Sequence, residues 1–171
     1  MKITLKDGSV LEYNEAKTAA DITKDISMGL FRNATCCKIN GEVKDLRTVI
    51  DTDASLEILT FDDEDGRKAF NHTASHIMAQ AVKRLYPEAK LTIGPAIDNG
   101  FYYDFDVEKS FSPEDLTKIE AEMKKIVKED PEIKRFELPV DEAIALMESK
   151  NESYKIELIK EHAEKGEPIS F

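Results

Sequence analysis

The sequence contains no tryptophan, only two cysteines, and no apolar run long enough to cross a bilayer. The two cysteines are neighbours, Cys36 and Cys37, and adjacent residues of a strand point to opposite faces. This placement excludes a disulfide scaffold and favours one buried thiol and one exposed thiol. The first ten residues alternate apolar and polar types instead of forming the apolar core of a signal peptide. We therefore expect a cytoplasmic protein with no membrane partner.

Positive charge is also in deficit. The sequence has 24 lysines and arginines against 35 aspartates and glutamates, which gives a net charge of −11 at pH 7. A protein that binds nucleic acid through its overall field should be basic, because affinity comes largely from neutralising phosphates. Any contact with nucleic acid must therefore come from a local basic patch or from other parts of the protein. The length of 171 residues allows one sizeable domain or two small ones.

Residues 1–62 have the pattern of a small β-grasp (ubiquitin-like) domain. Turn signals at Asp7-Gly8 and Asn40-Gly41 each lie between short β-type runs and predict two hairpins. Between them, a helix is predicted to begin at Thr18 and to end at Gly29. With a last strand at residues 55–60, the order is β-β-α-β-β-β, which predicts a small sheet crossed by one helix.

The acidic, glycine-ended segment 62–66 is the predicted domain boundary, and a second α+β domain is predicted over 66–171. Its first helix covers residues 67–86, and the apolar residues of that helix fall on one face. Members of this apolar stripe are Phe70, Ala74, Ile77, Met78, Ala81 and Leu85. Further elements are predicted as a hairpin over 91–106 around Asn99-Gly100, helices over 112–128, 140–148 and 153–163, and strands at 133–138 and from 167 onwards.

His72 and His76 are one helical turn apart, and helical spacing places them opposite the predicted stripe. Spacing alone favours an exposed helix surface. The alternatives are two ligands of a larger metal site or two imidazoles that position or deprotonate a water for hydrolysis. No glutamate follows His72, which excludes the zinc-protease helix.

Residues 92–104 combine a close-approach glycine, Gly94, with tyrosines that offer a flat apolar face and a hydroxyl. Such a surface suits a sugar or a base, but spacing alone favours an ordinary hairpin with aromatic core residues. Lys155 has no pattern that sets it apart from a surface lysine.

Taken together, three segments resemble the editing domain of threonyl-tRNA synthetases, and residues 1–62 resemble the TGS domain. The segments are Asn71–Pro87, Ile93–Asp104 and Glu152–Lys155. The resemblance implies hydrolysis of the ester that joins serine to the 3′-terminal adenosine of threonine tRNA. It assigns catalytic roles to His72, His76 and Lys155 and substrate contacts to Gly94, Pro95 and Tyr103. We expect no resident metal, because two ligands alone rarely hold zinc.

In this family a later Cys-x-x-x-His segment and the aminoacylation domain would follow Phe171. We therefore expect an editing domain truncated at its C-terminal side, with weak or no activity and no cofactor of its own. ATP, magnesium and zinc are implied for the absent catalytic domain. The implied partners are threonine tRNA mischarged with serine, the rest of the synthetase chain, and a second subunit of a homodimer.

Two other functions remain open from the sequence. One is a non-catalytic regulatory module that binds tRNA or a partner. The other is a zinc-dependent trans-editing hydrolase of the alanyl type, against which the upstream β-grasp domain argues.

Overall fold

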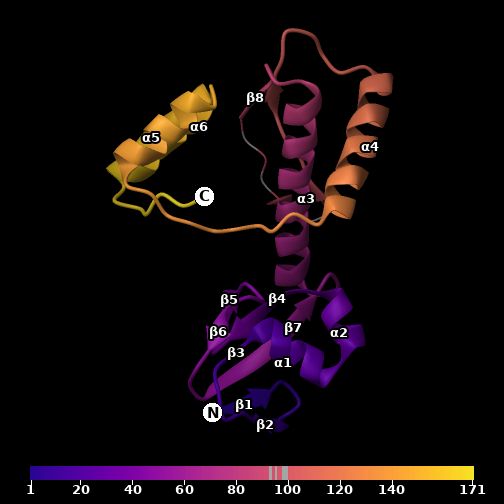
Figure 1. Cartoon of the computed structure of the whole chain (residues 1–171), viewed down its shortest axis with the longest axis vertical. Coiled ribbons are helices and arrows are strands. Elements are labelled where there is room, and N and C mark those ends of the chain that lie inside the picture. The colour runs from indigo at the N-terminus through magenta and orange to yellow at the C-terminus, as the bar shows by residue number, and fades with distance from the viewer. Residues whose placement is uncertain (93, 95, 98–99) are drawn as a thin grey trace. The chain divides into compact units, whose positions relative to one another are not determined.

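The computed structural model describes residues 1–92, 94, 96–97 and 100–171 (Figure 1). The chain forms two units, Met1–Thr73 and Ala74–Phe171. The division falls inside helix α3 (Glu64–Leu85), whereas the boundary suggested by the sequence, at residues 62–66, lies at the start of that helix.

Unit 1 is built on a five-stranded sheet with the order β2-β1-β7-β4-β5. Strand β1 runs parallel to β7, and the other neighbours in this sheet are antiparallel. The α+β class and the β-grasp domain predicted from the sequence are confirmed. The strands are β1 (Lys2–Leu5), β2 (Val10–Glu12), β4 (Ala34–Ile39), β5 (Glu42–Lys44) and β7 (Ala54–Thr60), with a separate short pair, β3 (Lys17–Thr18) and β6 (Val49–Ile50).

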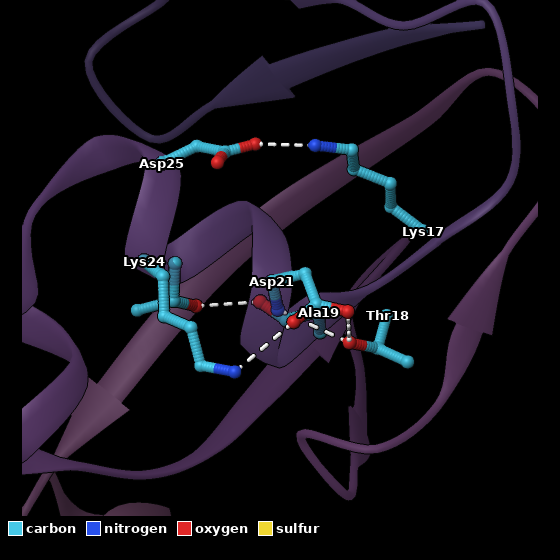
Figure 2. Close-up of polar contacts among 7 residues, drawn as sticks. Lys17, Thr18, Ala19, Asp21, Lys24 and Asp25 are labelled. Carbon is cyan, nitrogen blue, oxygen red and sulfur yellow. Dashed lines mark hydrogen bonds and ion pairs between the residues drawn. The ribbon is translucent and has the colours of Figure 1, made fainter.

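Helix α1 (Ala19–Ile26) packs its buried residues against the sheet. It begins where predicted, because Thr18 Oγ1 accepts a hydrogen bond from the Asp21 backbone N–H at 3.1 Å. Figure 2 shows this start of the helix, with Lys24 bonded to Asp21 at 3.0 Å and Lys17 bonded to Asp25 at 2.8 Å. The buried core of the unit consists of Ile3, Ala19, Ile22, Cys37, Ile50 and Leu56.

The prediction that Gly29 ends the helix is wrong. Helix α1 already ends at Ile26, and Ser27 caps a second short helix, α2 (Met28–Asn33), by accepting from the Gly29 N–H at 3.1 Å. Because Ser27 can act as an N-cap, a new helix begins directly after it, and Gly29 lies inside that helix instead of at the end of α1.

The expectation of one exposed thiol is also wrong. Cys37 is fully buried in the core, and Cys36, on the other face of the sheet, is only 4% exposed. The start of α3 covers that other face, where Lys38 pairs with Asp65 at 2.7 Å. Burial raises the pKa of both thiols, and it raises the pKa of Cys37 to about 11.

Unit 2 places the rest of α3 beside helix α4 (Pro113–Glu129) (Figure 1). Ser112 and Asp115 form a reciprocal capping box at the start of α4. Arg84 of α3 bonds Glu122 at 3.2 Å and Glu129 at 2.7 Å, and these ion pairs join the two helices outside their apolar contact.

The predicted hairpin over 91–106 is interrupted and forms two short antiparallel pairs. Strand β8 (Lys90–Leu91) pairs with β11 (Phe105–Asp106), and β9 (Ala96–Ile97) pairs with β10 (Gly100–Phe101). Asn99 of the predicted turn lies outside the described residues.

Helices α5 (Val140–Ser149) and α6 (Ser153–Glu164) pack on each other around their own small core. The strand predicted over 133–138 is reduced to a single antiparallel bridge between Glu137 and Ser170. The strand predicted from 167 onwards is likewise reduced to Ser170, the other residue of this bridge. None of the described helices is long and apolar enough to span a membrane.

The buried side of α3 differs from the predicted apolar stripe. Its most buried row includes Asn71, Ser75, Ala79 and Val82, which are 0–6% exposed. Phe70, expected in the core, is 51% exposed and contacts the Phe61 ring edge-on at 5.1 Å. Of the predicted stripe, Ala81 is fully buried, and Ile77 and Met78 are partly buried against the same core. The stripe is therefore buried in part, and small residues, polar ones included, complete the buried side.

Candidate functional site

Thr92 joins the two sides of the interrupted hairpin. Its backbone N–H and its hydroxyl both donate to the carbonyl oxygen of Asp104, at 3.2 and 2.7 Å. These two bonds continue the β8–β11 pairing by one residue. They bring the chain that follows Thr92 close to the chain that precedes Asp104.

Gly94 lies directly under the aromatic ring of Tyr103. A Cβ atom at position 94 would come 2.1 Å from Cδ2 of that ring, so only glycine leaves the ring where it is. The ring also stacks on Phe105, with centroids 4.9 Å apart and an interplanar angle of 21°. The close-approach role that the sequence suggested for Gly94 is thus filled by a side chain of the same segment.

Tyr103 is half-buried, and its phenol stays protonated over a wide pH range. Burial raises the pKa of Tyr103, and the negative charge of Glu152 raises it further. The hydroxyl is therefore a hydrogen-bond donor at neutral pH, beside a flat apolar ring.

Lys155 contacts this same segment from helix α6. Its Nζ donates to the carbonyl oxygen of Thr92 at 3.0 Å and lies 5.9 Å from the centroid of the Tyr103 ring. Burial lowers the pKa of Lys155, and the charge of Glu152 opposes this effect. A partly desolvated ammonium beside an aromatic wall can stabilise negative charge on a bound group more strongly than an exposed lysine can.

His72 and His76 are both exposed on α3, one turn apart. His72 belongs to unit 1 and His76 to unit 2, because the division falls between Thr73 and Ala74. At 3.6 residues per turn, His72 lies about 100° around the helix from the buried Asn71, and His76 lies about 100° from the buried Ser75. Both histidines therefore lie beside the buried row of α3, whereas their spacing predicted a position opposite the apolar stripe.

The described contacts thus join three of the predicted site residues, Gly94, Tyr103 and Lys155, into one cluster in unit 2. Pro95 lies outside the described residues. Over the part of the chain that is described, no group of three His, Cys, Asp or Glu side chains could hold a metal ion.

Three residues that support this cluster lie in segments that the sequence singles out, but the sequence assigned them no role. Thr92 supplies the carbonyl that Lys155 binds, and Glu152 and Lys83 form a salt bridge of 2.9 Å beside it. The sequence places Lys83 on the row of His72 and His76 along α3, but it gave this lysine no role. No local pattern marks Glu152 as buried, since its partner lies 69 positions earlier.

A separate cavity of about 510 Å³ lies at the C-terminal end of α3 and contains none of the predicted site residues. Tyr86 and Asp115, both in its wall, bond to each other at 2.8 Å. The Lys155 cluster is the better candidate site, because it brings three of the predicted residues together.

Comparison with known proteins gives one domain match and a set of close relatives. Residues 1–60 match the TGS domain family. The whole chain is 64% identical to a threonine–tRNA ligase of Acetivibrio thermocellus and covers 27% of it. It is also 61% identical over its full length to threonine–tRNA ligases of Clostridium perfringens and Clostridium tetani, of which it covers 26% and 27%. The chain therefore spans about a quarter of the length of these relatives, and it matches their N-terminal region.

Proposed function

We propose, from the premise that this chain corresponds to the N-terminal region of the threonine–tRNA ligases, that residues 66–171 belong to a proofreading hydrolase domain. Its substrate is threonine tRNA wrongly esterified with serine. The whole protein would join threonine to its tRNA in the cytoplasm. ATP, magnesium and zinc would be used by the part of the ligase that this chain does not include.

The need for a second site is physical. Serine lacks one methyl group of threonine, and a methyl-sized difference in a pocket gives only about 1–3 kcal/mol of discrimination. A ligase that selects by binding alone would therefore charge its tRNA with serine too often. A hydrolytic site that admits serine and excludes threonine by its size removes the error.

The observation that carries the proposal is the position of Lys155. Hydrolysis of the ester begins when a water oxygen attacks the carbonyl carbon, and negative charge then develops on the carbonyl oxygen. The partly desolvated Nζ of Lys155, next to the Tyr103 ring and the Thr92 carbonyl, is suited to stabilise that charge. The bond to the ribose oxygen then breaks, and that oxygen leaves with a proton.

The other predicted residues take supporting roles in this proposal. His72 and His76 orient the attacking water and the terminal ribose. Tyr103, held over Gly94, forms a wall for the substrate. The net charge of −11 implies that other parts of the ligase, or a local basic patch, supply most of the affinity for the tRNA.

The test is deacylation of serine-charged threonine tRNA by a full-length ligase that carries this region. Lys155→Met should lower the deacylation rate about 100- to 1,000-fold, the usual effect of removing one oxyanion donor. Lys160→Met is the matched control, because Lys160 is exposed on the same helix and should leave the rate unchanged. Retained aminoacylation by both variants would show that the enzyme is folded.

Full deacylation by Lys155→Met would contradict the role given to this lysine. A wild-type ligase that leaves the serine ester intact would instead favour the regulatory binding module.

A further inference from the structure

We propose that Glu152 is the positioning residue for Lys155, acting through a salt bridge to the half-buried Lys83 and a hydrogen bond to the backbone of Leu91. The inference rests on the proposed function, because it assigns the residue that prepares Lys155 for catalysis. Glu152 itself contacts no substrate in this proposal.

Glu152 is only 5% exposed, and both of its carboxylate oxygens are bound. Oε1 accepts from Lys83 Nζ at 2.9 Å, and Oε2 accepts from the Leu91 N–H at 3.2 Å. Glu152 is also the residue that precedes α6, yet its side chain makes no capping bond to that helix. The side chain is therefore used for contacts with distant segments.

Lys83 anchors the other side of this salt bridge. Its Nζ donates to Glu152, to the carbonyl of Pro87 at 2.9 Å and to the carbonyl of Ala89 at 3.0 Å. An ammonium group has three N–H donors, so all of them are used. Lys83 thus ties the C-terminal end of α3 and the turn before β8 to the start of α6.

The two bonds of Glu152 hold both partners of the Lys155 contact. On one side, Oε2 fixes Leu91, whose neighbour Thr92 provides the carbonyl that accepts from Lys155. On the other side, the backbone carbonyl of Glu152 accepts from the Lys155 N–H at 3.1 Å in the first turn of α6. Loss of the Glu152 carboxylate would release Leu91, and with it the Thr92 carbonyl, from the start of α6, while the backbone bond to Lys155 would remain.

Glu152 also acts on the charge state of the lysine. Burial lowers the pKa of Lys155, and the negative charge of Glu152 raises it. The segment before β11 places the neutral phenol of Tyr103 beside this ammonium, and Lys83 of α3 pairs with the same Glu152 carboxylate. Glu152 is thus the carboxylate that favours the protonated lysine, the form that can stabilise an oxyanion.

The experiment compares Glu152→Gln with Glu152→Asp and Glu157→Gln in the full-length ligase. The first removes the charge at constant shape, and the second keeps the charge on a shorter side chain. The third is the matched control on an exposed glutamate of the same helix. Deacylation of serine-charged tRNA is followed against pH, after subtraction of the uncatalysed hydrolysis.

We expect Glu152→Gln to lower kcat about 10- to 100-fold, the effect of misplacing a catalytic group, with KM within about twofold of wild type. The alkaline limb of its pH profile should move to lower pH, because the neutral lysine forms earlier. Glu152→Asp should recover part of kcat and the wild-type alkaline limb. Glu157→Gln should match wild type in both. A Glu152→Gln profile that coincides with that of Glu157→Gln would overturn the inference while the proposed function stood.

A second measurement separates the two proposals. The Nζ of Lys155 is titrated by NMR in wild type, Glu152→Asp and Glu152→Gln, with Lys155→Met used to assign the resonance. A pKa that falls in Glu152→Gln and not in Glu152→Asp supports the inference even if the ligase never cleaves the serine ester. An unchanged Lys155 pKa in Glu152→Gln overturns it, whatever the deacylation assay shows.

Discussion

Replacing Gly66 with alanine sets two physical effects of opposite sign against each other. Gly66 is buried in the first turns of α3, within unit 1. A Cβ atom there would lie 1.9 Å from the backbone oxygen of Thr60 and 2.8 Å from the hydroxyl oxygen of Thr35. The φ angle of Gly66 is not in the left-handed region, so space, and not backbone conformation, requires the glycine.

The magnitudes decide the sign. Alanine in place of glycine inside a helix should stabilise by about 1 kcal/mol. Forcing an extra methyl group into a filled site costs about 1–3 kcal/mol. The obstructing atom is a backbone carbonyl at the end of β7, which cannot move away as a flexible side chain could, so we expect a cost at the upper end. The net loss should be about 1–2 kcal/mol.

The assay is thermal unfolding, with amide hydrogen exchange of the β4 and β7 segments to report on unit 1 specifically. For a domain of this size, each 1 kcal/mol lowers Tm by about 4–8 °C. Gly29→Ala is the control, because Gly29 also lies in a helix and its Cβ would meet only the Ser27 hydroxyl, at 3.4 Å. It should be neutral or stabilising. If Gly66→Ala were as stable as Gly29→Ala, the contact between α3 and β7 would not have the geometry described here.

Three further predictions follow from single contacts. Gly94→Ala should lower kcat/KM for serine-tRNA deacylation about 10- to 100-fold, because the added methyl group displaces the Tyr103 ring. A wild-type kcat/KM would show that the position of this ring does not matter for the reaction. Cys37 should stay unmodified by iodoacetamide at pH 8 until the protein is unfolded, because burial raises the pKa of its thiol to about 11. The stability that the neutral thiol contributes is fully present below about pH 8.5 and is lost as the pH rises towards 11. Hydrogen bonds from the Ser112 backbone and hydroxyl lower the pKa of Asp115. The Tm difference between wild type and Asp115→Asn should therefore be largest above about pH 4 and should shrink as the pH falls further, which thermal unfolding across that pH range would measure.

Local chemistry explains why much of the fold could be predicted. The turn at Asn40-Gly41 needs left-handed backbone, and the structure has φ values of 52° and 85° at these residues. Thr18 and Ser112 cap helices because their hydroxyls accept from backbone N–H groups only three positions away. The prediction failed at Gly29, where the neighbouring Ser27 supplied a competing cap.

The rest depended on which surfaces meet. Cys37 lies in the core, and Cys36 on the opposite face is buried as well, because a segment outside the sheet covers that face. The pattern of a strand does not predict which segment will cover it. The buried row of α3 consists of small residues such as Ser75 and Ala79, while the bulky Phe70 stays half exposed, because close packing depends on shape as well as on apolarity.

The candidate site, too, was determined in part by the sequence and in part by the tertiary structure. The sequence by itself determined the helical spacing of His72 and His76 and, through its family resemblance, named Gly94, Tyr103 and Lys155 as residues to examine. Only the tertiary structure decided that the Tyr103 ring occupies the space over Gly94 and that Lys155 bonds a carbonyl 63 positions earlier. It also decided that the carboxylate of Glu152 pairs with Lys83 from a different helix. Turns and caps are set by neighbours in the chain, whereas burial and ion pairing are set by partners that folding brings from far along it.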